Sequence, residues 1–348
     1  MGKNSFFKKQ LTMNDVKMAV GIDISMDNFH ACIKVQNETG KVVIKGTKTF
    51  NNTGTGFKEF YGWASSRKKG DCSLSFVMEA TGIYYEDLAY FLHNEKERVS
   101  VVLANKMKGY AKSLNIKTKT DKVDAKIIAE FGIERQVEEW KPMSPVYKEL
   151  RDFCRELLSI KKEMNRAKNQ LHAMLRSHNK SKEIINLKKK QIAFYEKTVE
   201  TITKNLIKIV DMDPALKQKL TKLQSIPGLG FETSIILASE TNGFELFTSI
   251  RQLVSYAGLD IAFKESGQFK GKTRISKKGN SRIRQALFMP AMAACRHNES
   301  IKILYQRVCE RNPDIKRKGI VAGMRKLLIY AFVIWKKDIA YDREFVWS

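Results

Sequence analysis

Five short apolar segments in the first 140 residues have the composition of β-strands. They are rich in β-branched and aromatic residues, and glycine or polar residues bound them. The strands are expected at KMAVGIDIS, FHACIKVQ, GKVVIKGTKTF, SLSFVMEA and RVSVVLA, with helices at GFKEFYGWASSRK, YYEDLAYFLHNE and TDKVDAKIIAEFGIE. This order of elements predicts an α/β domain over residues 1–145.

A heptad pattern replaces the strand pattern from Tyr147 onward. Apolar positions alternate spacings of three and four, stop at the polar segment RSHNKSKE, and then resume. Two such stretches joined by a polar turn predict an antiparallel coiled-coil hairpin over residues 146–215. Its seam consists of Leu150, Phe153, Leu157, Ile160, Met164, Ala167, Leu171 and Met174, followed by Ile185, Lys188, Ile192, Tyr195, Val199, Ile202, Leu206 and Ile209, of which Lys188 alone is not apolar.

Residues 216–348 are expected to be mainly helical. The segment LQSIPGLGFETSIILASE, residues 223–240, resembles a helix-hairpin-helix, in which Gly228 and Gly230 would let backbone N–H groups approach a phosphate. A tight turn between packed helices is the alternative. The loop FKESGQFKGKTRISKKGN, residues 263–280, then interrupts the helices. The candidate nucleic-acid contacts in and just after this loop are Lys270, Lys272, Arg274, Lys277, Lys278 and Arg282.

The charge of the chain indicates a polyanionic partner. The 348 residues include 63 Lys and Arg against 37 Asp and Glu, a formal net charge of +26, which favours nucleic acid as the partner. A membrane surface is the alternative, but the longest apolar run, LLIYAFVIW, has about half of the ~20 residues that a membrane helix needs. The five cysteines are scattered and form no CxxC motif, which is typical of reduced thiols. We therefore expect a cytoplasmic protein.

Four carboxylates are candidates for metal binding. Asp23 lies in the apolar run GIDIS, Glu79 ends SFVMEA, and Asp121 and Asp124 share one face at the start of a helix. The predicted order of elements is that of the ribonuclease H-like (RuvC-like) fold: three strands, then helix, strand, helix, strand and helix. In this fold, acids from such elements come together at one site. Each acid alone is more typical of a turn or a helix cap. An actin-like ATPase is disfavoured, because GIDISMDN lacks a glycine-threonine phosphate loop.

At these motifs the chain resembles the DEDD transposases of bacterial insertion sequences, which are described as bridge-RNA-guided recombinases. The resemblance rests on VGIDIS, FVMEATGIYYEDLAYFL, KTKTDKVDAKIIAEF, SIPGLGFETSIILASE, LVSYAGLDIAFKESGQFKGKTRISKKGNSRIRQALFMPAMAA and GMRKLLIYAFVIWK. It implies a RuvC-like domain whose acids are Asp23, Glu79, Asp121 and Asp124, and a C-terminal transposase domain over residues 216–348 with a nucleophilic serine, Ser266. None of these five positions departs from the family pattern.

The resemblance also implies cofactors and partners. The four acids would bind Mg²⁺ or Mn²⁺, and the substrates would be donor and target DNA, selected by a guide (bridge) noncoding RNA. The composite site would form between protomers of a homo-oligomer, a dimer that assembles to a tetramer. Two alternatives stay open: a junction-resolvase type nuclease, in which water attacks the DNA, and a non-catalytic nucleic-acid-binding protein, in which the acids are structural.

Overall fold

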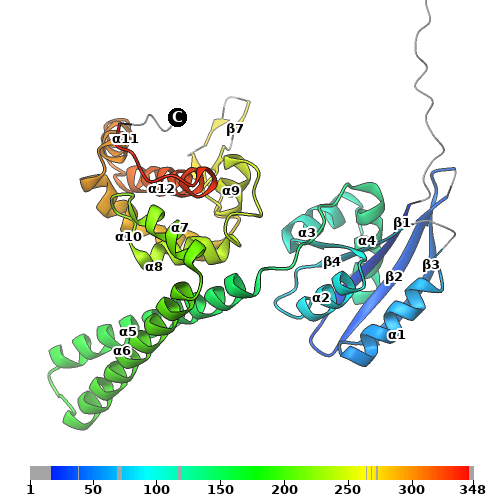
Figure 1. Ribbon diagram of the computed structural model, residues 1–348, viewed down its shortest axis with the longest axis horizontal. Helices are drawn as coiled ribbons and strands as arrows, with labels where there is room; N and C mark the ends of the chain where they lie inside the picture. Colours follow the sequence, from blue (N-terminus) through cyan, green and yellow to red (C-terminus); the bar gives the residue numbers. More distant parts are fainter. Residues whose placement is uncertain are drawn as a thin grey trace, which may run out of the picture. The chain divides into compact units, whose positions relative to one another are not determined.

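The chain forms two compact units, residues 1–142 and residues 143–348, in the computed structural model (Figure 1). The structure describes residues 17–37, 39–68, 73–116, 120–263, 265–267, 269–271 and 273–344. The predicted division of the second unit into a hairpin (146–215) and a C-terminal transposase domain (216–348) stays a prediction.

A five-stranded mixed sheet forms the centre of the first unit. The strand order is β3-β2-β1-β4-β5, in which β1 pairs antiparallel with β2 and β2 with β3, whereas β1 with β4 and β4 with β5 are parallel. This mixed α/β arrangement agrees with the predicted ribonuclease H-like domain. The strands are β1 (Met18–Ile24), β2 (Asn28–Gln36), β3 (Val42–Asn51), β4 (Leu74–Glu79) and β5 (Arg98–Val102).

Among the described residues, helices pack on this sheet through three apolar clusters. The largest cluster contains the aromatic side chains Phe29, Phe50, Phe60 and Phe76 and involves α1 (Gly54–Ser65) and α2 (Glu86–Asn94). Helix α4 (Asp121–Glu134) contacts β1 and β2. It lies so close to β1 that a Cβ atom added at Gly21 would be 2.1 Å from the backbone nitrogen of Ala129. The absence of a side chain at Gly21 therefore lets α4 approach the first strand.

One helix of the first unit was not predicted. Helix α3 (Ala104–Ser113) follows β5 and has the sequence ANKMKGYAKS. It is short, and its internal glycine costs about 1 kcal/mol of helix stability relative to alanine. Few apolar positions show a helical period, so tertiary packing of Met107 and Tyr110, both buried, stabilises this helix more than its own sequence does.

Two long helices, α5 (Pro145–Arg176) and α6 (Lys182–Asp211), pack against each other as a hairpin at the start of the second unit. The predicted seam positions Leu150, Leu157, Ile202 and Leu206 are buried. The polar seam residue, Lys188 of α6, donates a hydrogen bond of 3.0 Å to the side-chain oxygen of Gln170 on α5. The seam therefore accommodates a lysine without burying an unpaired charge. The description of the hairpin as a coiled coil stays a prediction.

The remaining helices enclose the largest apolar core of the chain, which also includes the base of the hairpin. They are α7 (Pro214–Gln224), α8 (Phe231–Glu240), α9 (Ile250–Tyr256), α10 (Ser281–His297), α11 (Glu299–Glu310) and α12 (Arg317–Lys337). Helix α8 is buried along most of its length. Within the described residues, none of the helices is both long enough and apolar enough to span a bilayer.

Candidate active site

The four predicted acids come from three neighbouring elements of the first unit. Asp23 lies near the end of β1 and Glu79 ends β4, and Ile22 pairs with Met78 in the parallel ladder between these strands. Both carboxylates therefore leave the sheet side by side at the carboxyl edge of adjacent parallel strands. Asp121 and Asp124 lie in the first turn of α4, where the hydroxyl of Thr120 caps the helix by accepting a hydrogen bond from the amide of Val123.

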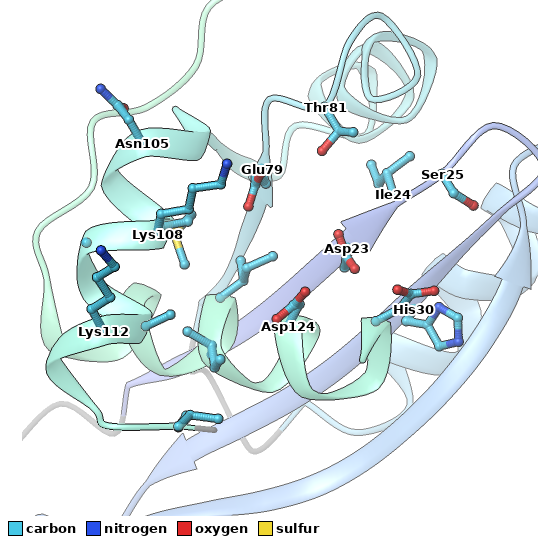
Figure 2. A pocket seen from close by; sticks show the side chains of 17 residues that line it. Asp23, Ile24, Ser25, His30, Glu79, Thr81, Asn105, Lys108, Lys112 and Asp124 are labelled. Atoms are coloured by element: carbon cyan, nitrogen blue, oxygen red, sulfur yellow. The ribbon is translucent and has the colours of Figure 1, made fainter. Parts of the chain in front are cut away.

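All four acids line one cavity of about 800 Å³. Figure 2 shows the side chains of Asp23, Glu79 and Asp124 directed toward a common space above the sheet. The predicted set of acids is thus brought together in one place. The cavity also has lining residues that were not predicted, and these include Ser25, His30, Thr81, Asn105, Lys108 and Lys112.

The donor atoms of this cavity suit a hard divalent cation. Carboxylate oxygens are the ligands that Mg²⁺ and Mn²⁺ prefer. Among the described residues, however, no group of three or more His, Cys, Asp or Glu side chains stands close enough together to hold one ion. The acids therefore fit Mg²⁺ bound by one or two carboxylates and completed by water and substrate phosphates, which is its usual mode in phosphate chemistry. They do not form a closed protein cage.

Ser266 lies in the second unit, in a small two-stranded hairpin. Strand β7 (Glu265–Ser266) pairs with β8 (Phe269–Lys270), and Ser266 is opposite Phe269. Gly267 follows with a φ of 55°, the left-handed conformation that glycine adopts without strain. Figure 1 shows β7 projecting from the helices of this unit, and the Ser266 side chain is exposed. A hydroxyl in this position is accessible to a large substrate such as DNA.

The two ends of the Ser266 loop are joined at its base. Strand β6 (Ile261–Ala262) pairs with β9 (Arg274–Ile275), and the amide of Asn280 donates to the carbonyl oxygen of Tyr256 at 2.6 Å. At Gly279, an added Cβ would lie 2.3 Å from that same carbonyl oxygen. The residue types of the loop are typical of a flexible segment. The loop is nevertheless closely packed where it enters and leaves the helical core.

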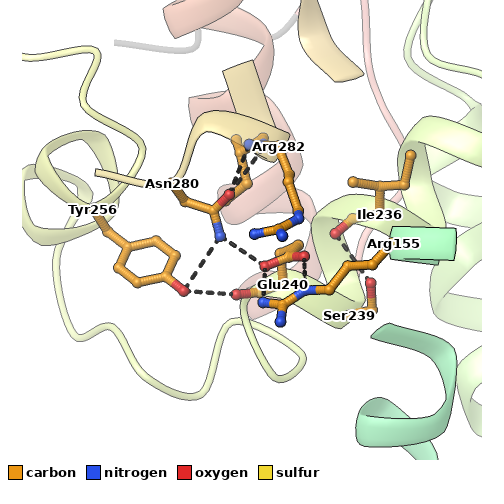
Figure 3. Close-up of polar contacts among 8 residues, drawn as sticks. Arg155, Ile236, Ser239, Glu240, Tyr256, Asn280 and Arg282 are labelled. Atoms are coloured by element: carbon orange, nitrogen blue, oxygen red, sulfur yellow. Dashed lines mark hydrogen bonds and ion pairs between the residues drawn. The ribbon is translucent and has the colours of Figure 1, made fainter. Parts of the chain in front are cut away.

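A buried carboxylate connects this base to the long helix α5 (Figure 3). Glu240, at the end of α8, is 2% exposed and accepts two hydrogen bonds from the Arg155 guanidinium, at 2.8 and 3.0 Å. The side-chain amide of Asn280 donates to the same carboxylate at 2.7 Å, while its oxygen caps α10. Burial raises the pKa of Glu240, but the hydrogen bonds from Arg155 and Asn280 outweigh it, so the pKa lies below its ordinary value.

Arg155→Ala is expected to destabilise the second unit by about 3 kcal/mol, because it leaves a buried carboxylate without its main partner. The matched control is Lys161→Ala, which removes the more exposed ion pair with Glu232 between the same two helices and is expected to cost less than about 1 kcal/mol. Urea denaturation measures both. If the two substitutions changed the free energy of unfolding equally, the burial of Glu240 would not add to the cost of losing its partner.

The same network predicts a pH dependence of stability. A carboxylate whose folded-state pKa is lowered contributes stability that is fully present above its unfolded-state value of 4.5. That contribution to the free energy of unfolding is lost as the pH falls through the lower folded-state pKa of Glu240. The Arg155→Ala variant should lack this contribution.

Comparison with known proteins identifies the family. Residues 20–180 match a family model described as "Transposase", of the DEDD type found in IS110 elements, and residues 220–306 match "Transposase IS116/IS110/IS902 family". The two matches follow each other in the chain and together cover most of it. The chain belongs to the IS110 family of transposases. It is a DNA transposase or recombinase.

Curated relatives align with this transposase over most of their length. The pilin gene-inverting protein of Moraxella bovis is 27% identical over 328 residues, which is 94% of this chain and 98% of the relative. The corresponding protein of Moraxella lacunata is also 27% identical over the same shares of both chains. The transposase for insertion sequence element IS1111A of Coxiella burnetii is 24% identical, over 84% of this chain and 81% of the relative.

The predicted nucleic-acid contacts of the transposase lie at two places in the second unit. Arg274, Lys277, Lys278 and Arg282 are exposed in and after the Ser266 loop, whereas Lys272 and the side chain of Lys270 fall outside what the structure describes. Gly230 is exposed at the start of α8. Gly228 has a φ of 99°, and an added Cβ would meet Ala294 of α10 at 2.9 Å. Helix packing therefore already requires glycine at position 228, and phosphate binding by either glycine stays a prediction.

Proposed function

We propose that this transposase cleaves and rejoins DNA strands with Ser266 as the nucleophile and with divalent ions, Mg²⁺ or Mn²⁺, each bound by one or two of the carboxylates of Asp23, Glu79, Asp121 and Asp124. The observation that carries the proposal is the convergence of these four carboxylates on one cavity at the carboxyl edge of β1 and β4. Carboxylate oxygens that line one cavity are ligands that suit a hard divalent cation, and such a cation would offset the charge of an approaching phosphate.

In this mechanism the Oγ atom of Ser266 attacks a DNA phosphorus atom. A bond forms between Oγ and phosphorus, the bond to the leaving sugar oxygen breaks, and the serine proton is lost while the leaving oxygen gains one. The DNA end is then held as a phosphoserine diester. The number of phosphate ester bonds is unchanged, so the hydroxyl of another strand can reverse the step without ATP.

Ser266 needs activation from outside its own loop. A serine hydroxyl is a weak nucleophile at neutral pH and requires a base or a metal. Residues 263–280 contain no histidine, and no described side chain forms a hydrogen bond with the Ser266 hydroxyl. A bound divalent ion supplies charge neutralisation at the phosphate and at the leaving oxygen. The exposed cations Arg274, Lys277 and Lys278 would hold the DNA backbone beside the serine.

Sequence selection is proposed to come from a guide RNA that base-pairs with donor and target DNA. In this arrangement the protein reads backbone shape and charge rather than bases. The hairpin of α5 and α6 supports this role, since residues 155–190 contain 11 Lys and Arg against 3 Glu. The working assembly is proposed to be a homo-oligomer, a dimer that forms a tetramer on two DNAs.

The test is strand exchange between two labelled DNA duplexes, with the element-encoded RNA and Mg²⁺ present and ATP absent. The proposal predicts joined products that carry both labels. A junction-resolvase type nuclease would give cut ends only, and that result would replace the recombinase mechanism. The relatives named for inverting a pilin gene favour rejoining, because an inversion requires that every cut strand be resealed.

A further inference from the structure

Helix α3 forms a positively charged wall of the acidic cavity. Asn105, Lys108 and Lys112 lie at spacings of three and four, so they share one face of the helix, and all three line the cavity. Figure 2 shows Lys108 directed toward the side of the cavity where Glu79 lies. One wall thus carries cations, and the other walls carry the carboxylates.

Packing of α3 against α4 fixes the rotation of α3. Met107 and Tyr110 are buried in a cluster with Ile127 and Ile128 of α4. The Tyr110 hydroxyl donates a hydrogen bond of 2.7 Å to the carboxylate of Glu134, at the end of α4. Burial raises the pKa of Tyr110, so the hydroxyl keeps the proton that it donates. These contacts fix the rotation of α3 and leave Lys108 and Lys112 exposed, while both lysines still line the cavity together with Met107.

Both lysines are available to an external anion. Their side chains are exposed, and neither forms an ion pair with a carboxylate in the part of the chain that the structure describes. Carboxylates disfavour the approach of a phosphodiester, and two lysines that line the same cavity favour it. Residues four apart on a helix have their Cβ atoms about 5–6 Å from each other. That separation is comparable with the distance between successive phosphates along a DNA strand.

We propose that Lys108 and Lys112 bind two consecutive backbone phosphates of the DNA strand that is cut, with the Asn105 amide as a further donor. This proposal rests on the proposed function, because it takes the acidic cavity as the place where the DNA strand is cleaved. The ligand is DNA rather than guide RNA, because the lysines line the same cavity as the carboxylates that would serve the cleaved strand. Their contacts are with phosphate, so they would position the strand without reading its bases.

The first test measures binding of the full-length protein to DNA in EDTA over a range of salt concentrations. The variants are Lys108→Gln, Lys112→Gln and the double variant, and the matched control is Lys106→Gln, an exposed lysine of the same helix that does not line the cavity. Each lost phosphate contact should reduce the slope of log K against log salt by about 0.9 on duplex DNA or about 0.7 on a single strand. The double variant should lose about twice that, and the control should keep the wild-type slope.

The second test replaces the two phosphates next to the cleavage site with uncharged methylphosphonates. The wild-type protein should then bind about as weakly as the double variant binds normal DNA, and the double variant should lose no further affinity. Full additivity of the two changes would overturn the proposal, as would a slope change for guide RNA but not for DNA. Binding in EDTA requires neither a metal nor Ser266. Its outcome is therefore separate from that of the proposed chemistry.

Discussion

Asp23→Asn is expected to slow DNA cleavage by about 10³-fold while leaving the protein folded. The substitution removes one charge and hardly changes the shape of the side chain, and Asp23 is only partly buried between Ile22 and Ile24. Metal neutralisation of a reacting phosphate contributes several kcal/mol. A loss of about 4 kcal/mol corresponds to a rate decrease of about 10³-fold. Initial rates of strand cleavage in Mg²⁺ measure this effect.

DNA binding separates the catalytic role of Asp23 from a structural one. In EDTA, Asp23→Asn should bind DNA at least as tightly as the wild-type protein, because a carboxylate that repels phosphate is gone. The matched control is Asp27→Asn, which removes an exposed carboxylate in the turn after β1 that does not line the cavity. The control should cleave normally. If Asp23→Asn also cleaved at the wild-type rate, the acids would be structural.

Ser266→Ala is expected to abolish strand cleavage and strand exchange together. The substitution removes an exposed hydroxyl and no core volume, so the free energy of unfolding should change by less than about 0.5 kcal/mol. Thr273→Ala is the control, since it removes another exposed hydroxyl of the same loop. Rates of cleavage and exchange are measured with the same labelled duplexes for both variants. Normal cleavage by Ser266→Ala would mean that water is the nucleophile.

The position of a side chain could be predicted best where a regular pattern of apolar residues determines it. Strands β1 and β4 are short apolar runs that each carry an acid near the end, and parallel neighbours in a sheet bring such ends together. The convergence of Asp23 and Glu79 could therefore be predicted once the order of the strands was recognised. The hairpin seam was visible for the same reason, because a heptad repeat over two helices specifies which residues face each other.

Features that depend on contacts between distant segments were missed. Helix α3 has a weak pattern of its own and is stabilised by Tyr110 on Glu134, so its two cavity lysines could not be assigned a direction. Glu240 ends the apolar run SIILASE. An acid at this position is visible in the sequence, but the sequence does not assign it a role. Its meaning depends on Arg155, which lies 85 residues away in the chain. His30 enters the cavity because it pairs with Asp23 across the sheet.

The central claim, that Ser266 is the nucleophile, is tested most directly by locating the bond between protein and DNA. The protein is incubated with Mg²⁺, guide RNA and a DNA substrate that is nicked near the cleavage site, so that the cleaved strand cannot rejoin. Digestion with trypsin and nuclease and mass spectrometry follow. Trypsin cuts after Lys264 and Lys270, so the account predicts a nucleotide attached to the peptide ESGQFK, residues 265–270, at Ser266. Cut DNA without any attached peptide, or with a different peptide attached, would contradict it.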